Sequence, residues 1–114
     1  MKLGKKYLKT EPLSMRGKKR YVLFQIFSEK KLPQPAVNEE FESLFLGLFG
    51  EKGFADQRYK LIEFDPASGN GVLRSSLECA EQSKAGLLFL QKIQGFPAFC
   101  RILAVSGSLA KLRQ

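Results

Sequence analysis

The chain has 114 residues, 44% of them hydrophobic and ten of them phenylalanine, with a net charge of +8 and a pI near 9.7. This length suits one small domain, and the hydrophobic content excludes a wholly disordered chain. The sequence has no apolar run of the roughly 18 residues that a membrane helix needs, and no apolar stretch of a secretory signal at its N-terminus. We therefore expect a cytoplasmic protein that does not bind a membrane.

The positive charge is concentrated at the N-terminus. Residues 1–20 hold eight of the 19 Lys and Arg residues and one of the 11 acidic residues, a net charge of +7, which leaves +1 for residues 21–114. Clustered Lys and Arg in a domain with a pI above about 9 are typical of nucleic-acid binding. A solubilising basic tail is the alternative. We divide the chain into a basic N-terminal arm, residues 1–19, and a single domain, residues 20–114.

The alternation of residues 20–28 predicts a first strand. On the face that we expect to meet the helices lie three apolar residues: Val22, Phe24 and Ile26. A helix over residues 36–50 follows, because apolar side chains recur there at i, i+4 and i+7. Gly50 and Gly53 are expected to end this helix.

Residues 58–65 and 72–77 predict two further strands, and the short turn PASGNG between them indicates an antiparallel hairpin. In the first of these strands we expect Ile62 and Phe64 to face inward. Residues 78–93 predict a second helix. Its apolar stripe comprises Cys79, Ala80, Ser83, Gly86, Leu87, Leu90 and Ile93.

Residues 98–106 predict a fourth strand, followed by a short terminal helix with Ser106 or Ser108 as its N-cap. The residues of this strand expected to face the helices are Ala98, Cys100, Ile102 and Ala104. The order β-α-β-β-α-β predicts a mixed α/β (α+β) fold of the ferredoxin-like type, which RRM domains share. We expect a four-stranded antiparallel sheet with two helices on one face and a short C-terminal helix.

The sequence shows no catalytic site of its own. It has no histidine and no phosphate-binding loop, and Ser106 and Ser108 have no base to activate them. Asp56, Glu63 and Asp65 are metal-ligand types, but a solvated hairpin edge explains them as well. The two cysteines are too few for a disulfide framework or a zinc site, and we expect both to be buried. We assign no catalytic and no metal-binding residue, and expect no cofactor bound by this chain.

The sheet face opposite the helices is expected to be unusually apolar for a soluble monomer. It should show Tyr21, Leu23, Phe27, Tyr59, Leu61, Phe99, Leu103 and Val105, with Glu63 and Arg101 among them. The third strand lacks the aromatic residues of an RRM, which disfavours stacking of single-stranded RNA on this face. Either a partner or the terminal helix, with Leu109 and Leu112, covers it. The residues predicted to bind a partner are Leu23, Phe27, Phe99 and Leu103.

Three stretches of the sequence resemble one family. TEPLSMRGKKRYVLFQIFSE at residues 10–29, GVLR at 71–74 and LAVSGSLAKL at 103–112 are similar to the opening, middle and closing motifs of archaeal ribonuclease P protein component 2, the counterpart of the eukaryotic Pop-five subunit. The resemblance implies a subunit that binds ribonuclease P RNA. That RNA removes the 5′ leader of precursor tRNA with Mg²⁺, so precursor tRNA would be met indirectly. The resemblance also implies pairing with ribonuclease P protein component 3, and leaves self-association in a two-plus-two assembly open.

Basic residues at both ends of the chain are the predicted RNA contacts. They are Lys5, Lys6, Lys9, Arg16, Lys18, Lys19, Arg20, Arg74, Lys111 and Arg113. Contacts of this kind bind phosphates and give position and affinity without reading sequence. Arg74 is alternatively a solvated or paired strand residue, and the helix start at Ser106–Ser108 either takes a phosphate or is simply capped. The alternative for the whole chain is a ferredoxin-like protein-interaction domain with a basic arm, or a sister subunit of the same complex.

Overall fold

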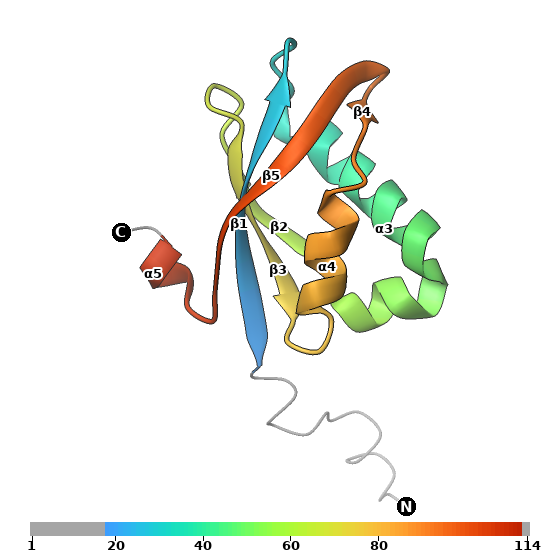
Figure 1. The fold of residues 1–114 in the computed structure, drawn as a ribbon, viewed down its shortest axis with the longest axis vertical. Helices are drawn as coiled ribbons and strands as arrows, with labels where there is room; N and C mark the ends of the chain where they lie inside the picture. The colour runs from blue at the N-terminus through green and yellow to red at the C-terminus, as the bar shows by residue number, and fades with distance from the viewer. Residues whose placement is uncertain (1–17, 113–114) are drawn as a thin grey trace, which may run out of the picture.

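Strand β1 (Lys19–Ser28) lies at the centre of the sheet in the computed structural model, which describes residues 18–112. It pairs antiparallel with β3 (Asn70–Ser76) on one side and with β5 (Phe96–Ser106) on the other. It is the blue strand of Figure 1 and begins at Lys19, the last residue of the predicted basic arm. The first strand was therefore predicted correctly, and it is the strand most enclosed by neighbours.

Two shorter strands complete the sheet at its edges, β2 (Lys60–Phe64) beside β3 and β4 (Lys92–Ile93) beside β5. The strand order is β2-β3-β1-β5-β4. All pairings are antiparallel, as in a ferredoxin-like fold. The predicted fold class is confirmed, and β4 is a fifth strand that the sequence pattern did not reveal.

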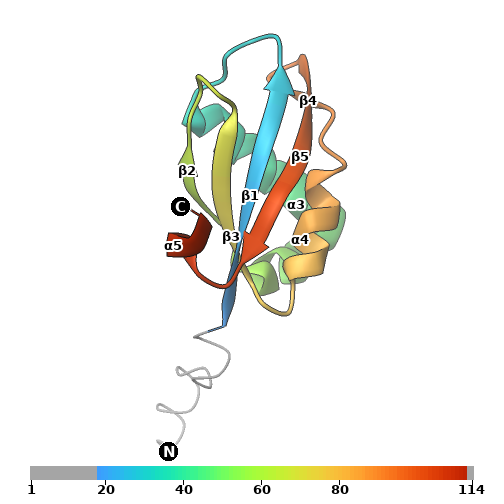
Figure 2. The same cartoon turned by 60° about the vertical axis from the view of Figure 1, so that its left-hand side comes forward.

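Helices α3 (Gln34–Gln57) and α4 (Ala80–Leu87) cover one face of the sheet. The short helix α5 (Leu109–Leu112) lies on the opposite side, where it contacts β1 and β5 (Figures 1 and 2). Within residues 18–112, none of the helices combines the length and the apolar character needed to span a membrane. The sheet thus has a covered face and a face that we call the open face.

The predicted core face of β1 is confirmed. Val22, Phe24 and Ile26 are all buried. Phe24 meets Phe41 of α3 edge-on, with ring centroids 5.3 Å apart, and Phe41 lies 6.1 Å from Phe45, one turn further along the helix. Full burial of one such side chain contributes roughly 1.5–3 kcal/mol. This aromatic layer is what holds α3 against the sheet.

Helix α3 is longer than predicted, because Gly50 bends it without ending it. The helix starts at Gln34, behind Pro33, and reaches Gln57. Gly50 has φ 76° and ψ 175°, so two helical segments meet there at a kink. Glycine tolerates this positive φ, which other residues rarely adopt.

Helix α4 is shorter than predicted and ends at Leu87. Leu90 and Ile93 are still buried, as the predicted stripe required, but they follow the helix. Ile93 pairs with Phe96 across a two-residue turn in which Gln94 and Gly95 both have positive φ, 53° and 83°. Positive φ at both central residues is the geometry of a type I′ hairpin. The QG pair therefore forms a hairpin between β4 and β5, where a simple helix end was expected.

A bulge in β2 changes which of its residues face the core. The ladder with β3 shifts by one residue between Leu61 and Glu63. An extra residue in one strand reverses the alternation of side chains beyond it. Leu61 is therefore buried together with Phe64, whereas Ile62, which was expected inside, is only half-buried. The prediction for Phe64 is confirmed, and those for Leu61 and Ile62 are wrong.

Tyr59 also lies on the covered side, contrary to the prediction. Its ring centroid is 5.4 Å from that of Phe45, and its hydroxyl donates a hydrogen bond to Asn38 Oδ1 at 2.8 Å. Burial raises the pKa of the Tyr59 hydroxyl well above its usual value, with a smaller contribution from the negative charge of Glu42. Tyr59 therefore stays neutral and fixes the start of β2 against α3.

A second shift occurs where β5 passes the middle of β1. Ile102 lies opposite Phe24, but Ala104 lies opposite Leu23 and Val105 opposite the buried Val22. Directly opposed residues share a face of the sheet, so Ala104 turns to the open face and Val105 to the side of Val22, where it is still 38% exposed. Both residues were expected the other way round. Ala98 and Cys100, which precede the shift, are buried as predicted.

The two cysteines differ in their surroundings. Cys100 is buried in the core, and burial raises the pKa of its thiol to about 12. It stays protonated at neutral pH and packs as a small apolar side chain. Cys79 is only half-buried at the start of α4, so the expectation of burial holds for Cys100 alone.

Gly86→Ala is expected to destabilise the fold by about 1–3 kcal/mol, the usual cost of overpacking a core. A Cβ at Gly86 would lie 2.8 Å from Phe45 Cε1, and Phe45 is fully buried. The urea midpoint should fall at an unchanged slope. Gly47→Ala in α3 is the matched control, because a Cβ there meets no atom within 4 Å. An unchanged midpoint for Gly86→Ala would contradict the close packing of α4 on α3.

Candidate nucleic-acid interface

The basic cluster that precedes β1 is anchored by the sheet. The carbonyl of Lys18 accepts a hydrogen bond from the N–H of Leu77 at 3.2 Å, so pairing with the β3 end begins at the cluster itself. The Arg20 guanidinium donates to the Lys19 carbonyl at 3.0 Å. It also lies against Gly107, where a Cβ would come within 2.9 Å of Arg20 Nη1. Lys18 is exposed, and Lys19 and Arg20 are half-buried.

The remaining predicted contacts divide into those that the structure places and those that it does not. Lys5, Lys6, Lys9, Arg16 and Arg113 lie outside the described residues. Lys111 lies on α5, which packs on the open-face side of β1 and β5. In the turn before α5, the N–H of Ser108 donates to the hydroxyl of Ser106 at 3.0 Å.

Arg74 projects from the open face near the N-terminal end of β1. Its Cα lies opposite Tyr21 of β1 on one side and opposite Lys60 of β2 on the other. Lys60 was missed by the sequence analysis. The predicted hairpin could have indicated that Lys60 lies near Arg74, since antiparallel pairing across a short turn brings the start of β2 beside the end of β3. The register, which the bulge offsets by one residue, could not be read from the turn alone.

The predicted partner residues form an apolar patch that runs from Leu23, in the middle of β1, to the other end of the open face. Phe27 and Phe99 lie opposite each other and stack, with ring centroids 4.9 Å apart and planes 18° from parallel. Phe99 is 60% exposed and Leu103 39% exposed, while Leu23 is half-buried. Helix α5 therefore leaves this patch largely uncovered. The Arg101 guanidinium lies over the Phe27 ring, 5.6 Å from its centroid.

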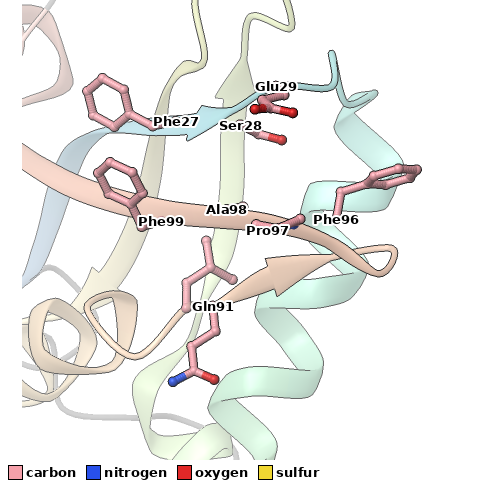
Figure 3. Close-up of a pocket in the computed structure, with 9 residues that line it drawn as sticks. Phe27, Ser28, Glu29, Gln91, Phe96, Pro97, Ala98 and Phe99 are labelled. Carbon is pink, nitrogen blue, oxygen red and sulfur yellow. The ribbon is translucent and has the colours of Figure 1, made fainter.

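A groove of about 700 Å³ continues from this patch around the start of β5 (Figure 3). Its lining is mainly apolar, with the polar ends of Ser28, Glu29 and Gln91 among the rings. Phe96 lies at its far side, and Lys30 Nζ is 4.8 Å from that ring centroid. The patch and the groove together present exposed aromatic rings with Arg101 beside them, and aromatic residues and arginine are enriched in protein interfaces.

The carboxylates that were considered as metal ligands have other partners. Asp56 accepts from Lys52 Nζ at 2.8 Å, and this bond and charge raise the pKa of Lys52. Asp65 accepts from the Ala67 N–H at 3.1 Å and from the Ser68 hydroxyl at 3.0 Å, which stabilises the turn between β2 and β3. Residues 18–112 contain no group of three or more side chains suited to hold a metal ion.

Comparison with known proteins identifies the family. Residues 20–114 match the Rpp14/Pop5 family. Ribonuclease P protein component 2 of Pyrococcus horikoshii is 33% identical over 107 residues, covering 94% of this chain and 89% of the relative. The protein of the same name from Methanococcus vannielii is 35% identical over 107 residues, covering 94% of this chain and 81% of the relative.

A solved structure, that of yeast ribonuclease MRP, contains a chain with a similar fold. The TM-score is 0.67 at 16% identity, and the alignment covers 81% of this chain and 76% of that one. This likeness concerns the fold alone. The family match covers residues 20–114, which include the middle and closing motifs and part of the opening one. The protein belongs to the Rpp14/Pop5 family.

Proposed function

We propose that this protein is an RNA-binding subunit of ribonuclease P, which assists the catalytic RNA in removing the 5′ leader of precursor tRNA. Family membership supports the complex, since the relatives are named as its component 2. The observation that carries the RNA-binding role is the net charge of +7 on residues 1–20, at whose end Lys18, Lys19 and Arg20 are bonded to the central strand and its neighbour.

The contribution of such a subunit is electrostatic. Folding an RNA and docking a tRNA precursor brings phosphates together, and the repulsion between them must be offset by cations. Lysine and arginine side chains held by a rigid strand provide this charge at a fixed place. Mg²⁺ at the RNA active site would supply the activated water and stabilise the phosphate undergoing cleavage. The protein should therefore lower the Mg²⁺ concentration that the reaction requires.

The partner protein in this proposal is ribonuclease P protein component 3. The patch formed by Leu23, Phe27, Phe99 and Leu103 is its expected docking surface, because exposed stacked rings beside an arginine suit a protein interface. Self-association in a two-plus-two assembly is compatible with this arrangement.

The proposed function is tested by purifying the tagged protein from the organism that naturally produces it and sequencing the RNA that copurifies. Enrichment of a single RNA with the ribonuclease P fold is the expected result. Recovery of a protein partner with no enriched RNA would favour the protein-interaction domain with a basic arm.

Asp56→Asn, Glu63→Gln and Asp65→Asn are each expected to leave the cleavage rate within a few fold, at saturating subunit. The structure gives Asp56 and Asp65 local structural partners, and in this proposal the reacting groups belong to the RNA. Single-turnover cleavage of precursor tRNA by the reconstituted complex measures the effect. A loss of three orders of magnitude from any one variant, in a folded and assembled subunit, would place catalytic groups on this chain.

A further inference from the structure

Two cations face each other across the β2–β3 ladder, on the open face of the sheet. Lys60 lies directly opposite Arg74, and Tyr21 of β1 is the neighbour of Arg74 on the other side. The residues that flank Arg74 point the other way: Leu73 is in the core, and the Ser75 hydroxyl bonds with Ser83 of α4 at 2.8 Å. Since side chains alternate along a strand, Arg74 and its partner Lys60 project from the open face.

The carboxylate on the same face of β2, that of Glu63, lies opposite Val72 and not opposite either cation. Within residues 18–112, neither Lys60 nor Arg74 has an ion-pair partner. The Nε of Arg74 is shielded from solvent and has no hydrogen-bond acceptor. Like charges directly opposed in a sheet are destabilising, and so is a shielded donor without an acceptor. Neither feature stabilises the free protein, and both would be relieved by a bound anion.

We propose that Lys60 and Arg74, with the phenol of Tyr21 beside them, form a binding site for one phosphate group of an RNA backbone. This inference deepens the proposed function and rests on it. Neighbouring strands are about 4.8 Å apart, so both cationic side chains can reach one phosphate. The guanidinium offers a planar fork of donors and the ammonium a mobile point charge.

The position of the site favours RNA over an acidic protein segment. Lys19 precedes Tyr21 by two residues on β1 and so shares its face. Lys18 and Arg20 lie at this same end of β1. A phosphate held by Lys60 and Arg74 would therefore lie next to phosphates held by Lys18, Lys19 and Arg20, whereas the exposed aromatic pair of the apolar patch, Phe27 and Phe99, lies at the opposite end of β1.

The test is the salt dependence of RNA binding by the full chain, using ribonuclease P RNA as the probe. Lys60→Gln with Arg74→Gln is expected to weaken binding about tenfold at 0.15 M salt and to flatten the log–log salt slope by about 0.7–0.9, the value for one phosphate. The urea midpoint should stay the same or rise, because a repulsive pair has been removed. A structural role for these residues would instead lower the midpoint.

The matched control is Lys52→Gln with Lys84→Gln. It removes the same charge, but from lysines that pair with Asp56 and Glu81 at 2.8 Å and 3.2 Å on the helices. Lys60→Gln alone, at an exposed position, serves if the double variant does not fold. A slope and an affinity equal to those of the control would overturn the inference, and so would loss of a protein partner with unchanged RNA binding. If the wild-type chain does not bind RNA, the proposed function itself fails.

Discussion

Replacing Lys18, Lys19 and Arg20 together by alanine is expected to give the largest loss of RNA affinity of any local change in the described domain. If the three side chains contact phosphates, the log–log salt slope should flatten by about 2–3 units. Their positions support a joint effect, since backbone bonds at Lys18 and Lys19 and the contact of Arg20 with Gly107 hold them at one place. Filter binding across a salt series measures the slope.

Two further measurements decide what the loss means. Added Mg²⁺ should restore most of the cleavage activity of this variant, because Mg²⁺ neutralises the same phosphates. The control is alanine at Lys30, Lys31 and Lys92, which removes equal charge from the other end of the sheet, where β1 ends and β4 lies. Equal losses of RNA affinity in the two triple variants would show that the total charge matters and that the position of Lys18, Lys19 and Arg20 at the start of β1 does not.

Leu103→Glu is expected to weaken assembly with ribonuclease P protein component 3 by at least a hundredfold. Burying an unpaired carboxylate in an apolar interface costs several kcal/mol or forces the group to take up a proton. The fold should lose no more than about 1–2 kcal/mol, because Leu103 is 39% exposed and only partly buried. Calorimetric titration of the two purified proteins gives the affinity, and urea unfolding gives the stability.

Leu88→Glu is the control for this prediction. Leu88 is 64% exposed and follows α4, away from the patch. It should not affect assembly. If Leu103→Glu assembled as well as the wild type and stayed as soluble, the patch would not be the docking surface, and the partner would have to bind elsewhere.

The order and type of the main elements could be predicted from the sequence because their signals are local. Alternating apolar residues in β1 and the short turn between β2 and β3 each depend on a few neighbouring residues. The two register shifts could not be predicted, since a bulge is a property of two paired strands. The shift between β2 and β3 placed Leu61 in the core, and the shift between β1 and β5 exchanged the faces of Ala104 and Val105. Gly50 likewise signals a break, but not whether the chain resumes a helix beyond it.

The candidate site shows the same division. The basic cluster at Lys18–Arg20 is contiguous in the sequence and was found there. The neighbours Lys60 and Arg74 are 14 positions apart in the numbering and meet only through the register of β2 and β3. Arg74 was found by its place in a family motif, whereas Lys60 had no motif to mark it. Residues that become neighbours only through strand pairing could therefore not be found from the sequence, and the structure was needed to identify them.

The length of the central strand sets a spacing. From Lys19 to Phe27, β1 runs unbroken for eight steps, which at the usual rise corresponds to about 26 Å. This is roughly three times the distance over which physiological salt screens a charge, about 8 Å. A phosphate bound at Lys19 and a charged group held beside the Phe27 ring would then not sense each other's charge. β1 would serve as a rigid spacer, and either ligand could arrive first without changing the affinity for the other through the field alone.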